Sequence, residues 1–293
     1  MAEQQIEGVG RTAIGVARVR AAESTRADRL FDDPHASAFV RAAAAGQPQA
    51  PAPDGPSRTG RVMAEGVVLR TRFFDDYLTG AANGGCRQVV LLAAGLDTRA
   101  FRLAWPPGTR LFELDLPEVL AFKERVLREE GAVPACERTA LPADLRGEWA
   151  AALAAAGFDP AQRTAWLAEG LLVYLSAGDA AALLTAVGEA SAPGSLLSLT
   201  HGQDLNRLVR QTRTGDEFRS VSDLWRGGLD EPADGWLRRH GWTTTAHAKN
   251  VLGDAYGRPQ PPERGGSFLV AERLPSAPAE GTGADGSGPD GTG

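Results

Sequence analysis

Short apolar runs alternate with longer helical patterns through the middle of the chain, and this alternation restricts the fold more than any other feature. Strands are predicted at Val89–Ala93, Arg110–Leu114, Thr164–Ala168, Ser195–Thr200, Thr243–His247 and Ser267–Glu272, with a weak one near Cys136–Ala140. Helices are predicted over Pro117–Glu130, Leu145–Ala156 and Gly178–Ser191. Such alternation predicts a doubly wound, mostly parallel α/β sheet that binds ligands at the carboxyl ends of its strands.

Composition divides the chain into three regions. Residues 1–85 hold two helical stretches, Val16–Glu23 and Val62–Leu78, and a break rich in proline, glycine and alanine at about 42–60. Such a break predicts a mobile loop. Residues 86–274 form the predicted Rossmann-like domain. Residues 275–293 contain little that could be buried, so we expect a disordered tail.

The charge balance argues against nucleic acid as a partner. The formal net charge is -6, whereas nucleic-acid-binding domains are usually basic, with clustered lysine and arginine. The charged stretch Lys123–Glu130 mixes both signs and is interpreted as a solvated helix face.

Neither a membrane segment nor a metal site is indicated. No run approaches the roughly 20 apolar residues that span a bilayer, and the N-terminus lacks the layout of a secretory signal. We therefore expect a cytoplasmic location. The two cysteines, Cys86 and Cys136, have no histidine or cysteine at ligand spacing, so neither zinc nor a disulfide is expected.

Acidic residues follow several of the predicted strands, where they would face one edge of the sheet. Glu113 and Asp115 end the second strand, Asp144 follows the third, and Glu169 follows the fourth. Asp115 lies twenty residues after Gly95, the glycine of the first strand–turn–helix unit. An acid at that offset typically accepts hydrogen bonds from ribose hydroxyls, which predicts this role for Asp115.

The turn after the first strand, in VVLLAAGLDTRAF, favours a nucleoside without a pyrophosphate. A pyrophosphate site needs several glycines and a free helix N-terminus, but this turn has only Gly95 and places Asp97 at the helix start. Asp97 would repel phosphate and suit a cationic group. S-adenosylmethionine carries adenosine, a sulfonium and an amino acid, and is therefore favoured over NAD. A nicotinamide-dependent oxidoreductase and a non-catalytic S-adenosylmethionine-binding protein remain open as alternatives.

The carboxylate of such a cofactor needs a cationic partner. Arg70 and Arg72 lie on a predicted helix before the first strand, and arginine is the usual clamp for a carboxylate. Pairing of both with Asp75 and Asp76 on the surface is the alternative.

These residues make the sequence resemble the leucine carboxyl methyltransferase-like family of S-adenosylmethionine-dependent methyltransferases, in its bacterial branch. The matching stretches are RAAES, LFDDPHA, RTRFFDDYL, VVLLAAGLDTRAFRL, ELDLPEVLAFK, ADLR and AEGLLVYL. Their order and spacing make the resemblance fairly specific, from about residue 15 to residue 273. It implies a class I methyltransferase fold: a mostly parallel seven-stranded sheet with helices on both faces and a helical N-terminal cap.

The resemblance also implies roles for individual residues. Arg70 corresponds to the arginine that holds the cofactor carboxylate, with Arg72 as the second choice. Gly95 corresponds to the glycine of the first motif and Asp115 to the ribose-binding acid. Asp144 and Leu145 match the pair beside the adenine, and Glu169 the glutamate near the amino group. Eukaryotic members also have a cap lysine, and the corresponding stretch near Arg20 offers none.

The expected activity is O-methylation of a carboxylate or hydroxyl on a small molecule or a peptide end. A carboxylate is already ionised near pH 7, whereas a hydroxyl usually needs a general base. His201 is the only histidine predicted at the functional edge, and capping of the next helix is its alternative role. Tyr174 and Trp166 are interpreted as core residues. The acceptor and the oligomeric state do not follow from the sequence.

Overall fold

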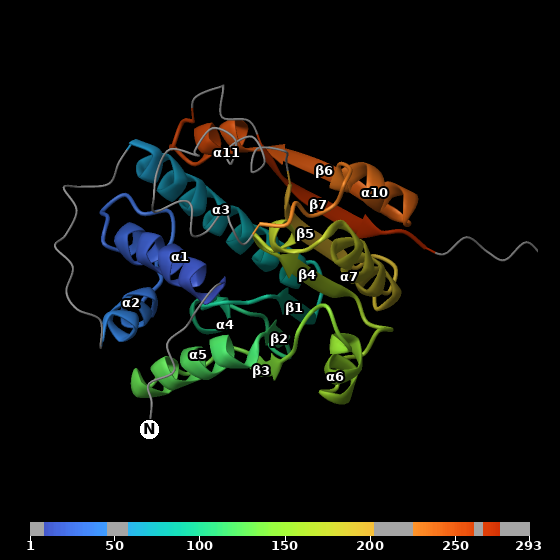
Figure 1. Cartoon of the computed structure of the whole chain (residues 1–293), viewed down its shortest axis with the longest axis horizontal. Helices are drawn as coiled ribbons and strands as arrows, with labels where there is room; N and C mark the ends of the chain where they lie inside the picture. Colours follow the sequence, from blue (N-terminus) through green and yellow to red (C-terminus); the bar gives the residue numbers. More distant parts are fainter. Residues whose placement is uncertain (1–8, 46–57, 202–224, 261–265, 276–293) are drawn as a thin grey trace, which may run out of the picture.

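The computed structural model describes residues 9–45, 58–201, 225–260 and 266–275 of the 293-residue chain. Within them, seven strands form one sheet in the order β3-β2-β1-β4-β5-β7-β6 (Figure 1). The strands are β1 Gln88–Leu92, β2 Arg110–Asp115, β3 Glu137–Pro142, β4 Thr164–Ala168, β5 Leu196–His201, β6 Trp242–Ala248 and β7 Ser267–Arg273. β1 to β5 run parallel, and β7 runs antiparallel to both of its neighbours. The predicted mostly parallel seven-stranded fold is confirmed.

Helices cover both faces of this sheet. They are α1 Val9–Ser24, α2 Ala36–Ala44, α3 Arg58–Asn83, α4 Arg99–Arg102, α5 Pro117–Glu129, α6 Trp149–Ala155, α7 Ala177–Glu189, α10 Ala233–Arg239 and α11 Lys249–Ala255, with a short 3₁₀ helix at Leu172–Tyr174. One face packs against α6, α7 and α10, and the other against α3 and α4. Both helical layers are visible in Figure 1.

The central strands β1 and β4 are buried at every position because both of their faces are covered, whereas the edge strands β3 and β6 are partly exposed. Successive side chains of a strand point to opposite faces, so Val90 and Leu92 belong to the core under α6 and α7. Val89 and Leu91 belong to the core under α3. A strand buried on both sides reads as a continuous apolar run, which explains why these strands are readable from sequence.

The first two helices form a layer over the turn that follows β1. Ile14 of α1 and Phe39 of α2 pack with Leu96 of that turn and with Phe122 of α5. Arg20 fixes α1 in place, because one guanidinium nitrogen donates to the Leu96 carbonyl (2.5 Å) and another lies 3.3 Å from Asp33. This helical layer corresponds to the expected cap.

The residues that follow α11 also form hydrogen bonds with the cap. Arg258, after α11, donates to an Asp28 carboxylate oxygen (2.9 Å) and to Glu23 (3.4 Å) at the end of α1. The Tyr256 hydroxyl donates to Asp76 of α3 (2.9 Å). Arg258 and Tyr256 therefore join the segment between β6 and β7 to α1, to the residues that follow it and to α3.

The strands lie within two residues of their predicted bounds at each end, and β4 coincides with its prediction. α6 begins at Trp149 and not at Leu145, because residues 144–147 form a turn in which the Gly147 N–H donates to the Asp144 carbonyl. α2 ends at Ala44 and α3 begins at Arg58, so most of the predicted loop at 42–60 lies outside the described residues. The predicted tail, apart from Pro275, lies outside them as well.

Two charged residues differ from their predicted surroundings. Lys123, expected on a solvated face, is 0% exposed, and its ammonium donates to Glu113 at 2.6 Å. Glu113, expected at the functional edge, also accepts from Arg138 (2.7 Å) and points between β2, β3 and α5. Both predictions were wrong because the two charges compensate each other inside the protein.

Among the described helices, none combines the length and the apolar character that crossing a membrane requires.

Candidate functional site

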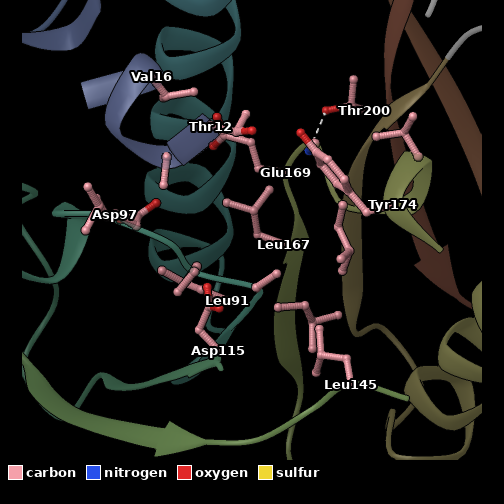
Figure 2. Close-up of a pocket in the computed structure, with 18 of the residues that line it drawn as sticks. Thr12, Val16, Leu91, Asp97, Asp115, Leu145, Leu167, Glu169, Tyr174 and Thr200 are labelled. Atoms are coloured by element: carbon pink, nitrogen blue, oxygen red, sulfur yellow. Dashed lines mark hydrogen bonds between the residues drawn. The ribbon is translucent and has the colours of Figure 1, made fainter. Parts of the chain in front are cut away.

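A cavity of about 450 Å³ lies where the strands end, between the sheet edge and the helices α1 and α3. Its size is ordinary for a small-molecule site. It is lined from α1 by Thr12, Ala13, Val16 and Arg20, from α3 by Met63, Val67, Arg70 and Thr71, and from the segments that follow the strands by Asp97, Arg99, Asp115, Asp144, Leu145, Arg146, Glu169, Tyr174, Thr200, Trp225 and Arg226, among others. In Figure 2, Asp97 and Asp115 lie on one side of it and Tyr174 and Thr200 on the other.

The turn after β1 forms part of the floor. Ala93 and Gly95 both have left-handed backbone angles (φ 54° and 52°), which bend the chain sharply as it leaves the strand. The Gly95 N–H donates to a carboxylate oxygen of Asp115 (2.5 Å), so the turn and the end of β2 are held together. Left-handed alanine is uncommon, and such strain is often found at functional sites.

Asp115 is placed with free acceptor capacity toward the cavity. One carboxylate oxygen accepts from Gly95 and the other from the Leu116 N–H (2.7 Å), which leaves lone pairs on both. The residue is 8% exposed and lines the cavity. Burial raises the pKa of Asp115 above its ordinary value, although the two backbone donors and Lys123 oppose that shift.

Arg99 is the centre of a buried ion-pair cluster that sequence reasoning missed. It is 2% exposed and donates to Asp75 (2.7 Å), to Glu169 (2.8 Å) and to Asp97. The Asp97 carboxylate also accepts from the Arg99 N–H (2.7 Å). Asp97 therefore has a cationic partner within the protein. The only feature of the sequence that could have indicated a role for Arg99 is its position in the turn, two residues after Asp97.

Glu169 and Arg70 form a second ion pair on the cavity wall. Arg70 Nε donates to Glu169 Oε1 at 2.8 Å, while the other oxygen of Glu169 accepts from Arg99. Burial alone would raise the pKa of Glu169, but Arg99 and Arg70 together hold it below its ordinary value. Glu169 is thus ionised in a cavity that exposes both members of the pair.

The alternatives for the two arginines separate cleanly. Arg72 donates to Asp76 (3.0 Å) and to the Leu30 carbonyl (2.9 Å), and it does not line the cavity. The surface-pair interpretation therefore holds for Arg72, and Arg70 is the arginine in the cavity. Asp144 and Leu145 both line it, with the Asp144 carboxylate bound by its neighbour Arg146.

The cavity has the groups that a nucleoside with an amino-acid chain requires. Asp115 has acceptor lone pairs, and Thr12 Oγ1 and Arg20 Nε are buried on the opposite wall without a hydrogen-bond partner among the described residues. Buried polar atoms without partners are costly, so a bound ligand would satisfy them. Four carboxylates line the cavity, from Asp97, Asp115, Asp144 and Glu169, and all but Asp115 are paired with an arginine.

Three residues discussed for the acceptor differ in their placement. Trp166 is fully buried, as predicted. Tyr174 was wrongly assigned to the core: it lines the cavity, because the 3₁₀ helix after β4 turns it toward the ligand space. His201 ends β5 opposite Ser267, and its side chain lies outside what the structure describes.

Asp97 is expected to make the free energy of unfolding depend on pH in the acidic range. Burial disfavours its charge, but Arg99, Lys123 and Arg20 lower the pKa of Asp97 to about 2. A carboxyl with a lowered pKa stabilises the fold above its unfolded pKa, near 4, and loses that effect as the pH falls toward 2. We expect about 2 kcal/mol of the free energy of unfolding to disappear across this window. Urea titrations of wild type and Asp97→Asn between pH 5 and pH 2.5 measure it, and parallel acid dependence in both would contradict the assignment.

Comparison with known proteins agrees with this geometry. The family model described as leucine carboxyl methyltransferase matches residues 13–188. A protein of Frankia alni, provisionally described as an S-adenosyl-L-methionine-dependent methyltransferase, is 53% identical over 277 residues, which cover 93% of this chain and 98% of the relative. A Streptomyces coelicolor protein with the same description is 47% identical over 257 residues, covering 87% and 90%.

Solved structures share the fold at low identity. One is a provisionally assigned methyltransferase from Thermobifida fusca (TM-score 0.53, 18% identity, 88% of this chain and 94% of that one). Another is a DUF574 family protein from Streptomyces avermitilis (TM-score 0.56, 15% identity, 88% and 97%).

Proposed function

This chain belongs to the leucine carboxyl methyltransferase family and is an S-adenosylmethionine-dependent methyltransferase, and on that premise we propose that it is an O-methyltransferase. Its acceptor is a carboxylate or a hydroxyl on a small molecule or a peptide end. The observation that carries the proposal is the cavity. Arg70, Asp115 and Glu169 line it under the cap, and the hydrogen-bond donors Tyr174 and Arg226 line its side nearest β5. The acidic net charge of -6 supports a partner other than nucleic acid, and we propose a cytoplasmic location without membrane binding.

The adenosine part of the cofactor is assigned to residues that follow β1, β2 and β3. Asp115 accepts from the ribose hydroxyls, and Gly95 allows the nucleoside to approach the backbone. Asp144 and Leu145 flank the adenine, since they follow β3 at the far end of the cavity from β5. Asp115 in β2 and Glu169 after β4 lie on either side of the β1 turn.

The amino-acid end fits the paired charges beside that turn. Arg70 holds the carboxylate, while Glu169 and Asp97 attract the ammonium. The Arg70–Glu169 pair presents one positive and one negative group, and the amino-acid end of the cofactor carries the complementary two. Arg20, where eukaryotic members have a lysine nearby, supplies a further cation on the cavity wall.

The residues act mainly by positioning. When bound, the cofactor supplies a methyl group on a sulfonium, an electrophile that an oxygen attacks in line. The cap excludes water, and the cavity wall sets the distance and angle of approach. A carboxylate acceptor needs no base, whereas a hydroxyl acceptor needs one, for which His201 is the candidate.

Mass spectrometry tests the proposal. The protein is incubated with S-adenosylmethionine and a library of carboxylic acids matched with alcohols and phenols of the same skeleton. A mass gain of one methyl group on oxygen, together with release of S-adenosylhomocysteine, is the expected result. Methylation on nitrogen, sulfur or carbon only would overturn the O-methyltransferase assignment.

Arg70 and Arg72 offer a matched pair of variants on one helix. Arg70→Gln is expected to weaken S-adenosylmethionine binding at least tenfold, because a charge-assisted hydrogen bond contributes about 1.5–3 kcal/mol. Arg72→Gln loses the exposed pair with Asp76 and the hydrogen bond to the Leu30 carbonyl, both outside the cavity, and is expected to bind like wild type. Isothermal titration calorimetry measures both affinities. Equal effects of the two substitutions would exclude Arg70 as the carboxylate clamp.

A further inference from the structure

Two carboxylates on the cavity wall converge on one nitrogen atom. Arg99 Nη1 donates to Asp97, in the turn after β1, and to Glu169 (2.8 Å), in the segment after β4. Oxygens that share a donor in this way lie within roughly 6 Å of each other. Both residues line the cavity (Figure 2). Asp97 and Glu169 thus form an acidic pair with one buried cation between them.

Carboxylates as close as this acidic pair repel each other, so one of them usually keeps its proton. Burial raises the pKa of Glu169, and the charge of Asp97 adds to that effect. Arg99 and Arg70 nevertheless hold this pKa below its ordinary value. The basic groups that act on the pair are Arg20 of α1, Arg70 of α3, Arg99 of α4 and Lys123 of α5. Among the described residues, Arg99 is the only one of these within ion-pair distance of both carboxylates.

Arg99 is also held by α3. Its Nε donates to Asp75 (2.7 Å), and its Nη2 donates to the Thr71 carbonyl (3.3 Å). Arg102 donates to both oxygens of Asp75 (2.6 Å each) and so fixes that carboxylate. The guanidinium is planar, so bonds at more than one of its edges fix its orientation. The place of Arg99 is therefore set by α3 and does not depend on a bound cofactor.

The acidic pair has acceptor capacity left for a ligand. Each oxygen of Asp97 accepts one bond from Arg99, either from the backbone N–H or from the guanidinium. Each oxygen of Glu169 likewise accepts one bond, from Arg70 or from Arg99. A carboxylate has about four lone-pair sites, so both groups can accept further hydrogen bonds. A primary ammonium carries a positive charge and three donors, and it is the ligand group that such a pair fits.

We propose that Arg99 is the positioning residue of an ammonium site: it keeps Asp97 and Glu169 side by side and ionised, and this pair binds the ammonium of the cofactor's amino-acid chain. The inference rests on the proposed function and adds the residue that makes its ammonium site possible. Arg99 acts through the pair and not on the ligand, because four bonds within the protein engage its guanidinium.

Loss of this guanidinium affects Asp97 most. Glu169 and Asp75 each keep another arginine, but Asp97 has no other cation within ion-pair distance among the described residues. A buried carboxylate without such a partner has a raised pKa and takes up a proton near neutral pH. An ammonium that binds there has to displace this proton to solvent. Replacing Arg99 is therefore expected to couple ammonium binding to proton release.

Calorimetry with two ligands tests this role: S-adenosylhomocysteine, and its deaminated analogue, whose chain ends in a carboxylate alone. Each is titrated between pH 5.5 and pH 8 in buffers of different ionisation enthalpy, so that the protons released on binding are counted. Wild type is expected to prefer the amino compound by about tenfold or more at every pH and to release no proton. Arg99→Gln is expected to lose this preference at pH 5.5 and to regain part of it at pH 8. It is also expected to release up to about one proton, with the amino compound only.

Arg102→Gln is the matched control. Arg102 lies on the same helix, α4, has a side chain that is 3% exposed and also pairs with Asp75, but it does not line the cavity. This variant is expected to lose stability and yet to keep the wild-type preference for the amino compound without proton release. Arg99→Lys is a less disruptive second variant, because it keeps a cation beside Asp97, and is expected to lie between wild type and Arg99→Gln.

Circular dichroism identifies the variants that are folded. A folded Arg99 variant with the wild-type preference at pH 5.5 and no proton release would overturn the inference, and so would equal proton release by Arg102→Gln. Equal binding of both ligands by wild type would overturn it as well. Failure of wild type to bind S-adenosylhomocysteine at all would instead count against the proposed function.

Discussion

Replacing Asp115 by alanine is expected to weaken S-adenosylmethionine binding by at least about 100-fold. Two ribose hydroxyls donating to an ionised carboxylate contribute about 1.5–3 kcal/mol each, and every 1.4 kcal/mol is a factor of ten. The carboxylate also holds the Gly95 turn, so its loss loosens the floor of the cavity as well. Asp115→Asn keeps the shape and one acceptor oxygen and is expected to lie between wild type and alanine. Isothermal titration calorimetry at pH 7.5 measures all three.

Glu118→Ala provides the control for charge. Glu118 is an exposed acid three residues after Asp115, in the first turn of α5, and it does not line the cavity. Its removal is expected to change the affinity less than twofold, as is usual for an exposed surface charge. If Asp115→Ala binds the cofactor as well as Glu118→Ala does, Asp115 is not the ribose-binding residue. A thermal melt of each variant separates lost binding from lost folding.

Replacing Arg99 by leucine is expected to destabilise the fold by about 3–5 kcal/mol, as when one partner of a buried ion pair is removed. Asp97 loses its contacting cation, while Asp75 and Glu169 keep Arg102 and Arg70. Asp97 then has to be buried with no cation in contact, only the charges of Lys123 and Arg20 nearby, or take up a proton. Urea unfolding monitored by circular dichroism measures the change.

Arg125→Leu is the matched control for Arg99→Leu. Arg125 forms an exposed pair with Glu129 one turn along α5, and such pairs contribute about 0.3–0.5 kcal/mol. A loss of stability in Arg99→Leu no larger than in Arg125→Leu would show that the buried cluster does not hold the fold together. The cofactor affinity of Arg99→Leu, measured where the variant is still folded, reports separately on the placement of Glu169.

The central parallel strands were predictable because burial on both faces leaves a continuous apolar run between turns, whereas the edge strand β3 is partly exposed and gave only a weak signal. β4, TAWLA, is buried at every position and was predicted with its observed bounds. α10 and α11 were not predicted: each has only seven residues, which is too short for a clear helical periodicity. Predicted helix starts also failed where a local turn competes, as it does before α6.

The site was predictable where position alone decides. Asp115 and Glu169 line the cavity because strand ends meet at one edge of a parallel sheet, and the first strand–turn–helix unit identifies that edge. Partner choice was not predictable. Lys123 and Glu113 form an ion pair inside the protein. Arg99 forms ion pairs with carboxylates from three separate segments. Such pairings depend on three-dimensional contacts between residues that lie far apart in the chain.

The contact of Arg258 with Glu23 and Asp28 has a consequence for how the protein is made. These partners lie 235 and 230 residues earlier in the chain. At about 5–20 residues per second, a ribosome needs on the order of ten seconds or more to reach Arg258 after it has made α1. During that time the apolar side chains of α1, such as Ile14 and Ala17, lack part of the contacts that bury them in the complete fold. Arg258 thus reaches α1 only after the segments between them have been synthesised, and the contacts that hold the roof of the binding cavity are complete only at that stage.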